Sequence, residues 1–246
     1  MSAEQTSIAF LGPEASYSHE ASLKIFEPIN KFLPAPSIGN VFSNVDIGKT
    51  DYGVVPVENS TEGIVSISLD CLAKHNLKIV KETTIPVNHS LLSNNALEEI
   101  EVIYSHPQAL RQCTNWIRKN LPLAELIEVS STARAAEIAL EINCSAAIGS
   151  PKAAQIFNLN VLANSIQDME GNQTRFLAIS RSEAEQKEAS KTSLIITTEH
   201  QPGKLVNALL PFKKHKINIT HVESRPSKLK PWEYMFFVDI EGHANN

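Results

Sequence analysis

A hydroxyl and a guanidinium stand side by side in the polar segment 168–177, at Thr174 and Arg175. This segment leads into the apolar alternation that begins at Phe176, so we expect a loop that enters a strand. A threonine hydroxyl can hydrogen-bond a departing group, and a guanidinium can bind a carboxylate through two parallel hydrogen bonds. A strand threonine beside a solvent-facing arginine is the ordinary alternative, so the meaning of this pair depends on the segments that lie near it.

A second polar segment, 58–63, lies between two stretches of core-like composition. Its polar side chains include Asn59, Ser60, Thr61 and Glu62. A loop this polar between buried elements is more often functional than a simple connector. Because Asn, Ser, Thr and Gly are also common turn formers, an ordinary turn is the alternative.

Ser16 and Ser18 follow a Gly12-Pro13 turn at the expected start of a helix. Backbone N–H groups and hydroxyls at the positive end of a helix favour an anionic ligand. Ordinary N-capping by these serines is the alternative, and from the sequence alone it is the more common explanation.

Polar groups also surround the start of the helix expected after Pro107. The apolar stripe of this helix consists of Leu110, Cys113 and Ile117. Gln108 and Gln112 lie on roughly the opposite side, so Gln112 either lines a cleft together with Ser105 or is solvated. His106 fits a helix cap better than a general base, because no carboxylate lies near it in the sequence.

Strands followed by helices recur up to residue 182. This order predicts an α/β fold with a parallel or mixed sheet, helices on both faces, and ligands at the carboxyl ends of the strands. Residues 77–92 alternate apolar and polar side chains, which predicts a long strand that passes from one lobe to another. The charged segment 183–191 is predicted as a linker, and a separate βαββ unit follows it. We expect its strands at 193–198, 217–224 and 232–241, a turn at 200–203, a helix at 204–214 and a loop at 225–230.

The composition indicates a globular protein that acts on a small molecule. The chain has 246 residues, 42% of them hydrophobic, and a net charge of −5 without a long basic cluster, which argues against nucleic-acid binding. No apolar run approaches the ~20 residues of a membrane span, and the expected first strand begins too early for a signal peptide. Cys71, Cys113 and Cys144 lack metal-ligand spacing and indicate reduced cysteines of a cytoplasmic protein.

Several polar segments together resemble the prephenate dehydratase family. They are Gly12-Pro13 with Ser16-Tyr17-Ser18, Pro-Val-Glu-Asn-Ser-Thr-Glu-Gly at 56–63, Tyr-Ser-His-Pro-Gln at 104–108 and Asn-Gln-Thr-Arg-Phe at 172–176. Pro-Gly-Lys-Leu at 202–205 and Glu-Ser-Arg-Pro at 223–226 resemble its C-terminal ACT regulatory domain. The resemblance runs from about Ile8 to the end of the sequence.

The resemblance implies conversion of prephenate to phenylpyruvate by loss of water and carbon dioxide, without a metal or an organic cofactor. It also implies two α/β lobes arranged like a periplasmic binding protein, with the active site between them. The expected dehydratase domain is 1–182, with lobe 1 at about 1–76 and 164–182 and lobe 2 at about 77–163. A linker at 183–191 and a ferredoxin-like ACT domain at 192–246 follow. Family members are homodimers or homotetramers, and L-phenylalanine inhibits them through the ACT domain.

The same resemblance assigns roles to individual residues. Its candidate catalytic residues are Thr174, Asn59, Ser105 and Gln112. Its candidate substrate-binding residues are Arg175, Phe176, Ser16, Ser18, Ser60, Thr61 and Glu62. A strong ion pair on the ring carboxylate of prephenate would stabilise the charge that decarboxylation must disperse. We therefore expect Arg175 to hold the pyruvyl carboxylate and neutral donors to surround the ring carboxylate.

The ACT-like region departs from the family pattern. Its candidate phenylalanine-binding residues are Gly203, Leu205, Asn218, Glu223, Ser224, Arg225 and Pro226. An ACT domain normally runs βαββαβ, and this sequence supplies βαββ, so we expect an incomplete ACT domain and an exposed edge at the strand 193–198. Lys204 stands where the family usually has a small residue. Both departures put feedback inhibition by phenylalanine in doubt.

Two alternatives remain open from the sequence. Arogenate dehydratase has the same fold and differs in its substrate, which carries an amino group in place of the keto group. A non-catalytic amino-acid sensor would keep the cleft and the ACT unit, but it would not need a hydroxyl beside a leaving group, so Thr174 argues against it.

Overall fold

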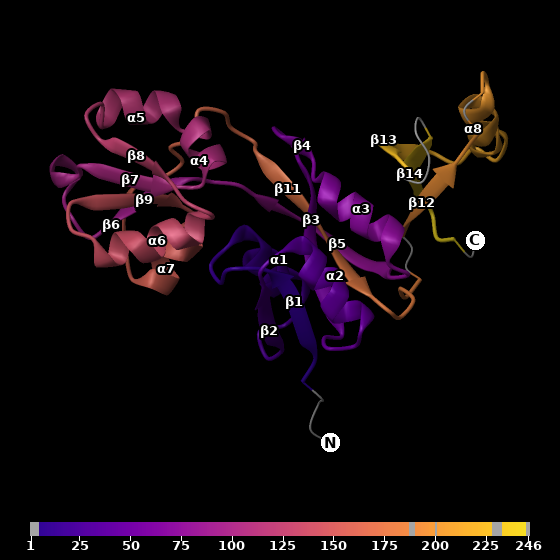
Figure 1. The fold of residues 1–246 in the computed structure, drawn as a ribbon, viewed down its shortest axis with the longest axis horizontal. Helices are drawn as coiled ribbons and strands as arrows, with labels where there is room; N and C mark the ends of the chain where they lie inside the picture. The colour runs from indigo at the N-terminus through magenta and orange to yellow at the C-terminus, as the bar shows by residue number, and fades with distance from the viewer. Residues whose placement is uncertain (1–4, 187–189, 200, 228–232, 245–246) are drawn as a thin grey trace. The chain divides into compact units, whose positions relative to one another are not determined.

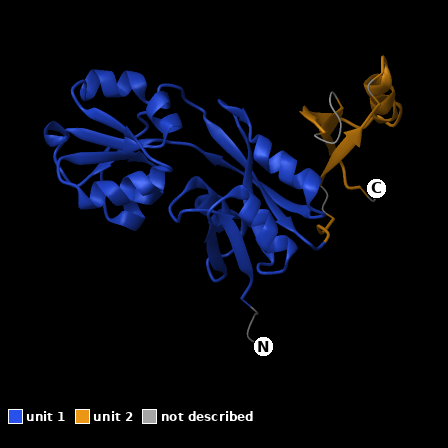
Figure 2. Ribbon diagram, in the orientation of Figure 1, with its two compact units in different colours: residues 1–182 blue, residues 183–246 orange. Residues whose placement is uncertain are grey.

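This computed structural model describes residues 5–186, 190–199, 201–227 and 233–244. The chain divides into two compact units, residues 1–182 and residues 183–246 (Figure 2). His200, Lys230 and Trp232, which the sequence analysis assigns to a turn, a loop and a strand, lie outside the described residues. Within the described ranges, no helix has the length and apolar character needed to cross a bilayer.

The first lobe of residues 1–182 is built on a mixed sheet with the strand order β2-β1-β3-β11-β5, and the short β4 pairs with β3 (Figure 1). β1 runs parallel to β2 and β3, whereas β11 runs antiparallel to β3 and β5. The strands are β1 (Ser7–Leu11), β2 (Lys31–Ala35), β3 (Tyr52–Asn59), β4 (Gly63–Ile64), β5 (Lys78–Pro86) and β11 (Gln173–Ser180). The helices are α1 (Tyr17–Ile25), α2 (Ile38–Asp46) and α3 (Ser66–Lys74).

Alternating side chains of β1 explain why helices cover both faces of this sheet. Ile8 and Phe10 are fully buried in a cluster that includes Ala21 of α1. Ala9, between them, is buried in a second cluster that includes Phe42 of α2. A strand that is apolar on both faces must be covered on both faces, which is the predicted arrangement.

The second lobe holds another mixed sheet, in the order β10-β6-β9-β7-β8. Its strands are β6 (Ser90–Ser93), β7 (Val102–Ser105), β8 (Glu125–Glu128), β9 (Ser145–Gly149) and β10 (Asn160–Ala163). Its helices are α4 (Pro107–Gln112), α5 (Thr114–Asn120), α6 (Thr132–Glu141) and α7 (Pro151–Phe157), with a 3-10 turn, η1, at Leu97–Glu99. Leu110, Cys113 and Ile117 share one buried cluster, which confirms the predicted stripe.

The strand predicted to pass between the lobes is interrupted. β5 lies in the first sheet and β6 in the second, and residues 87–89 connect them. The crossing was predicted correctly, but a single strand through 77–92 was wrong, because each half pairs within its own sheet. The first lobe therefore extends to Pro86, beyond the boundary at residue 76 that the sequence suggested.

Residues 183–246 form a βαββ unit. It contains β12 (Lys191–Thr197), α8 (Lys204–Lys214), β13 (Ile219–Pro226) and β14 (Tyr234–Glu241). Its antiparallel sheet has the order β12-β14-β13. In the described part of this sheet, β12 is an edge strand. β13 continues through Arg225 and Pro226, which the sequence analysis assigned to a loop.

Candidate active site

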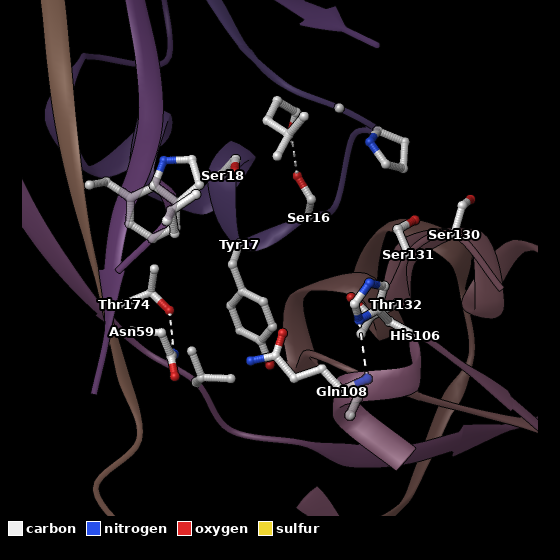
Figure 3. A pocket seen from close by; sticks show the side chains of 18 of the residues that line it. Ser16, Tyr17, Ser18, Asn59, His106, Gln108, Ser130, Ser131, Thr132 and Thr174 are labelled. Atoms are coloured by element: carbon white, nitrogen blue, oxygen red, sulfur yellow. Dashed lines mark hydrogen bonds between the residues drawn. The ribbon is translucent and has the colours of Figure 1, made fainter. Parts of the chain in front are cut away.

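A cavity of about 720 Å³ lies between the two lobes of residues 1–182. The first lobe contributes the start of α1 and the ends of β3 and β11, and the second lobe contributes α4 and the start of α6. The predicted site residues that line the cavity are Ser16, Ser18, Asn59, Gln112, Thr174 and Phe176. Figure 3 shows Thr174 and Asn59 on one side, His106, Ser131 and Thr132 on the opposite side, and Tyr17 between them.

Thr174 and Asn59 are directly opposite each other on β11 and β3, and both side chains are buried. Asn59 Nδ2 donates a hydrogen bond to Thr174 Oγ1 at 2.8 Å and another to Asn172 Oδ1 at 2.8 Å. Because Thr174 accepts from Asn59, the hydrogen of its own hydroxyl remains for a group in the cavity. This hydroxyl can therefore act as a donor to a ligand.

Gln112 of α4 links the second lobe to this pair. Its Oε1 accepts from Asn172 Nδ2 at 3.1 Å, and its Nε2 donates to Thr61 Oγ1 at 3.2 Å. His89 Nε2 lies 2.9 Å from the same Gln112 oxygen. The amide predicted either to line a cleft or to be solvated thus lines the cavity and connects its two walls.

Two ring systems in the cavity have shifted pKa values. Tyr17 donates its hydroxyl to the carbonyl of Asn88 at 2.7 Å, and burial, reinforced by Glu20, raises the pKa of this phenol well above its usual value. His106 caps α4 by accepting from the backbone of Gln108, as predicted. Burial, reinforced by Arg111, lowers the pKa of His106, so both rings are neutral at pH 7.

Helix starts from both lobes reach the cavity. Ser16 caps α1 by accepting from the backbone of His19, and Ser131 caps α6 by accepting from the backbone of Arg134. Of the described residues that line the cavity, none is a lysine or an arginine, and none is an aspartate or a glutamate. A carboxylate in this cavity would meet hydroxyls, amides and the positive ends of helices.

Arg175 does not line the cavity, which corrects its expected position. Its Nε and Nη2 lie 2.9 Å and 2.8 Å from Glu82 on the neighbouring strand β5. Successive side chains of a strand point to opposite faces of the sheet. Because Thr174 and Phe176 face the cavity, Arg175 between them faces away from it.

Ser105 is also placed elsewhere than expected. It is fully buried, and its hydroxyl donates to the carbonyl of Ile148 on β9 at 2.7 Å. Its side chain therefore joins two strands of the second sheet and does not face the ligand space.

Ser60, Thr61 and Glu62 are exposed and are not among the cavity-lining residues. They form the turn that holds Asn59. The backbone N–H groups of Thr61 and Glu62 each donate to Asn59 Oδ1 at 3.0 Å, and Ser60 accepts from the backbone of Gln173 at 2.9 Å. The segment thus positions Asn59, and its own exposed side chains do not line the cavity.

Several residues that line the cavity were not predicted to be site residues. They are Tyr17, His89, His106, Gln108, Ser130, Ser131 and Thr132. The sequence offered one signal for His89: it is a polar residue at the point where the alternation of apolar and polar residues in 77–92 is interrupted, between the two lobes. For Ser130 to Thr132, the signal was a hydroxyl-rich cap after a strand, the same pattern that identified Ser16.

Residues 183–246 contain a small pocket of about 130 Å³. It is lined by Thr198, Glu199, Gln201, Leu205, Tyr234 and Phe236. Among the predicted phenylalanine-binding residues, Leu205 lines it. Gly203, with a φ of 80°, precedes α8, and Asn218 donates to Glu241 at 2.9 Å. The other four predicted residues, Glu223 to Pro226, are paired with β14, and Lys204 forms an ion pair with Glu199 at 2.7 Å.

The described ranges contain no cluster of side chains that could form a metal site. No group of three or more His, Cys, Asp or Glu residues there is arranged to hold a metal ion. Cys113 is buried, and burial raises the pKa of its thiol to about 12, so this thiol is protonated at neutral pH.

Comparison with known proteins gives consistent matches along the chain. The family model described as "Prephenate dehydratase" matches residues 8–184. A bifunctional chorismate mutase/prephenate dehydratase of Aquifex aeolicus is 46% identical over 96% of this chain. The chain spans 66% of that relative, so it covers slightly less than two thirds of the relative's length.

Two solved structures are similar over nearly the whole chain. The prephenate dehydratase of Arthrobacter aurescens in complex with L-Phe is 33% identical, with a TM-score of 0.88, and the match covers 97% of this chain and 81% of that one. GqqA, described as a novel type of quorum quenching acylase, is 29% identical, with a TM-score of 0.85, and the match covers 96% and 88% of the two chains.

Proposed function

Because the chain belongs to the prephenate dehydratase family, we propose that it converts prephenate to phenylpyruvate, a step toward L-phenylalanine. The observation that carries this proposal is the Thr174 hydroxyl. It accepts from Asn59 at 2.8 Å and so keeps its own hydrogen for a ligand in the cavity. A dehydratase needs such a donor at the departing hydroxyl.

The reaction breaks two bonds and consumes one proton. The bond between the ring carbon and its carboxylate breaks, which releases carbon dioxide and leaves an electron pair for the ring. The C–O bond across the ring breaks in turn, and the hydroxyl takes up a proton and leaves as water. A neutral threonine is too weak an acid to give up its proton outright, so Thr174 polarises the leaving hydroxyl through its hydrogen bond, and the proton that completes the water comes from solvent.

The two carboxylates of prephenate are held by neutral donors in this proposal. Both carboxylate-bearing groups belong to the ring carbon opposite the hydroxyl, so both lie away from Thr174, near the helix starts at Ser16 and Ser131. The absence of lysine and arginine from the described lining supports this assignment. A ring carboxylate without an ion pair disperses its charge more easily during decarboxylation, so neutral donors favour the transition state over the ground state.

Arogenate is the second candidate substrate. It carries an ammonium group where prephenate has a keto oxygen, and the positive helix starts that favour a carboxylate disfavour an ammonium unless a carboxylate side chain pairs with it. The absence of aspartate and glutamate from the described lining therefore favours prephenate. An acylase reaction like that of GqqA would need a nucleophile activated by a base, whereas the hydrogen-bond partner of Thr174 is an amide nitrogen.

The test uses the purified full chain. Prephenate and arogenate are incubated with it in separate reactions, and phenylpyruvate and phenylalanine are followed. We expect phenylpyruvate from prephenate and little turnover of arogenate. Turnover of arogenate alone would make the chain an arogenate dehydratase. Binding of prephenate without turnover would indicate the non-catalytic sensor and overturn the proposal.

The second part of the proposal concerns regulation. Residues 183–246 act as an ACT domain that binds L-phenylalanine, in a homodimer or homotetramer of a cytoplasmic enzyme. The similarity to a dehydratase solved with L-Phe supports this role. Activity measured against rising L-phenylalanine should fall, and light scattering should give a mass of two or four chains. A flat activity curve would exclude feedback through this unit while leaving the catalytic proposal intact.

A further inference from the structure

A continuous chain of amide hydrogen bonds runs from Thr174 to His89. The direction of each bond follows from the backbone. Amide oxygens and nitrogens of Asn and Gln are normally assigned from their surroundings. Here the backbone N–H groups of Thr61 and Glu62 can only donate, so the Asn59 atom that they contact must be its oxygen. The Asn59 nitrogen must then face Thr174.

The direction of the next hydrogen bonds, across the cavity, is fixed in the same way. The nitrogen of Asn59 also donates to Asn172 at 2.8 Å, so that atom of Asn172 is its oxygen. Asn172 therefore turns its nitrogen to Gln112 at 3.1 Å, and the atom of Gln112 that receives it is Oε1. His89 Nε2 lies 2.9 Å from this oxygen, so the hydrogen between them must belong to His89.

We propose that His89 is a positioning residue for the dehydration: its Nε2–H holds the Gln112 amide in the orientation that the hydrogen-bonded amides between Gln112 and Thr174 require. This role rests on the proposed dehydratase function. The backbone at Thr61 and Glu62 fixes one end of the chain and His89 fixes the other. If Gln112 turned over, its nitrogen would face the nitrogen of Asn172, and two donors would oppose each other.

The surroundings of His89 hold its ring in place. Its side chain lies at the crossing between the lobes, the residue is 3% exposed, and its backbone N–H donates to Gln167 Oε1 at 3.0 Å. On the other side of the ring, Nδ1 lies 3.4 Å from the hydroxyl of Tyr17, which gives its own hydrogen to Asn88. The neutral ring has one hydrogen, which the Gln112 oxygen places on Nε2, so Nδ1 keeps a lone pair.

A positioning role differs from acid–base catalysis in its response to pH. Burial lowers the pKa of His89, against the opposing effect of its bond to Gln112, so the neutral ring predominates at pH 7. Nε2 carries a hydrogen in both the neutral and the charged ring. Protonation of His89 thus leaves the bond to Gln112 intact, and turnover should not follow its titration.

Three variants of the full chain test the proposal with prephenate as substrate. His89→Leu removes the donor, and we expect kcat to fall by about 10²-fold, as for a misplaced catalytic group, with a smaller change in KM. His89→Gln keeps an N–H near the position of Nε2 and should recover most of kcat with an unchanged pH profile. His75→Leu is the matched control, because His75 is a largely buried histidine elsewhere in the first lobe, paired with Asp46. It should lower the melting temperature without lowering kcat.

The outcomes separate this inference from the proposed function. If the wild type does not turn over prephenate, the proposed function fails. If the wild type is active and His89→Leu retains its kcat, the positioning role fails alone. If the wild-type pH–kcat profile has an acidic limb and this limb is absent in His89→Gln, His89 acts as an acid–base catalyst and the inference is overturned. Nitrogen NMR of the His89 ring in the wild type gives a test that does not depend on a variant that folds. We expect a protonated Nε2 and an unprotonated Nδ1. The opposite tautomer would contradict the hydrogen-bond directions described above.

Discussion

The hydroxyl of Thr174 has one hydrogen. Because Asn59 is the donor in the hydrogen bond between the two residues, this hydrogen is available to a ligand in the cavity. Thr174→Ala removes this hydrogen, and we expect kcat to fall by about 10²–10³-fold, or about 3 kcal/mol, as for loss of one positioned donor. Folding stability should fall by about 1 kcal/mol at most, because Asn59 keeps its other partners. Thr174→Ser is the control and should keep most of the activity in a phenylpyruvate assay. Near-full turnover of the alanine variant would contradict the site.

Asn59→Asp tests the direction of the same hydrogen bond at nearly constant volume. A carboxylate still accepts from the backbone of Thr61 and Glu62, but it cannot donate to Thr174. We expect the hydroxyl hydrogen of Thr174 to turn toward the carboxylate, so that the leaving group loses its donor and kcat falls to about the level of Thr174→Ala. Steady-state kinetics at pH 7 measure this effect. Wild-type kcat in the aspartate variant would mean that Thr174 does not need Asn59 as a donor.

Strand geometry separates Thr174 from Arg175 at the scale of the elements. β11 turns Thr174 and Phe176 to the cavity and Arg175 to Glu82. We expect Arg175→Gln to change the free energy of unfolding by about 1 kcal/mol or less, as for a partly exposed ion pair, and to leave KM for prephenate unchanged. Glu82→Gln is the matched control and should have a similar effect. A rise in KM of about tenfold for Arg175→Gln alone would return Arg175 to the substrate site.

The same geometry explains what the sequence could predict. The alternation of strands and helices predicted the α/β class, and capping residues such as His106 marked helix starts correctly. The strand period also implies that Thr174 and Arg175 face opposite ways, but it does not say which of them faces the ligand. Ser105 illustrates the same limit, because its burial depends on its pairing with β9. His89 required knowledge of the contact with Gln112, which lies 23 residues away in sequence.

One buried and two half-buried histidines make the stability of the molecule depend on pH. Burial lowers the pKa values of His19, His89 and His106 below 6.5. The unfolded chain then binds more protons near pH 6, so their contribution to stability is complete above pH 6.5 and is lost as the pH falls through the lowered values. Glu20, whose pKa is raised by burial, has the opposite effect, because it destabilises the fold as the pH rises.

We therefore expect a net loss of stability on acidification from about pH 7 to about pH 5.5, since three histidines oppose one glutamate. Urea denaturation at several pH values measures it. His89→Gln should make the dependence shallower by up to about one proton. An equal or steeper dependence in this variant would show that His89 keeps an ordinary pKa in the folded protein.

The connection between the lobes has a consequence for the engineering of the molecule. β5 and β11 are neighbouring antiparallel strands whose ends meet at Pro86 and Gln173, and Val87 donates to the carbonyl of Asn172 at 2.8 Å. The whole second lobe thus occupies the place of a hairpin loop in the first. Replacement of residues 87–172 by a short turn would leave every strand pair of the first sheet intact. The second lobe is thus a module inserted into the first. Its replacement by another domain would change one wall of the cavity and leave Thr174 in place on the other.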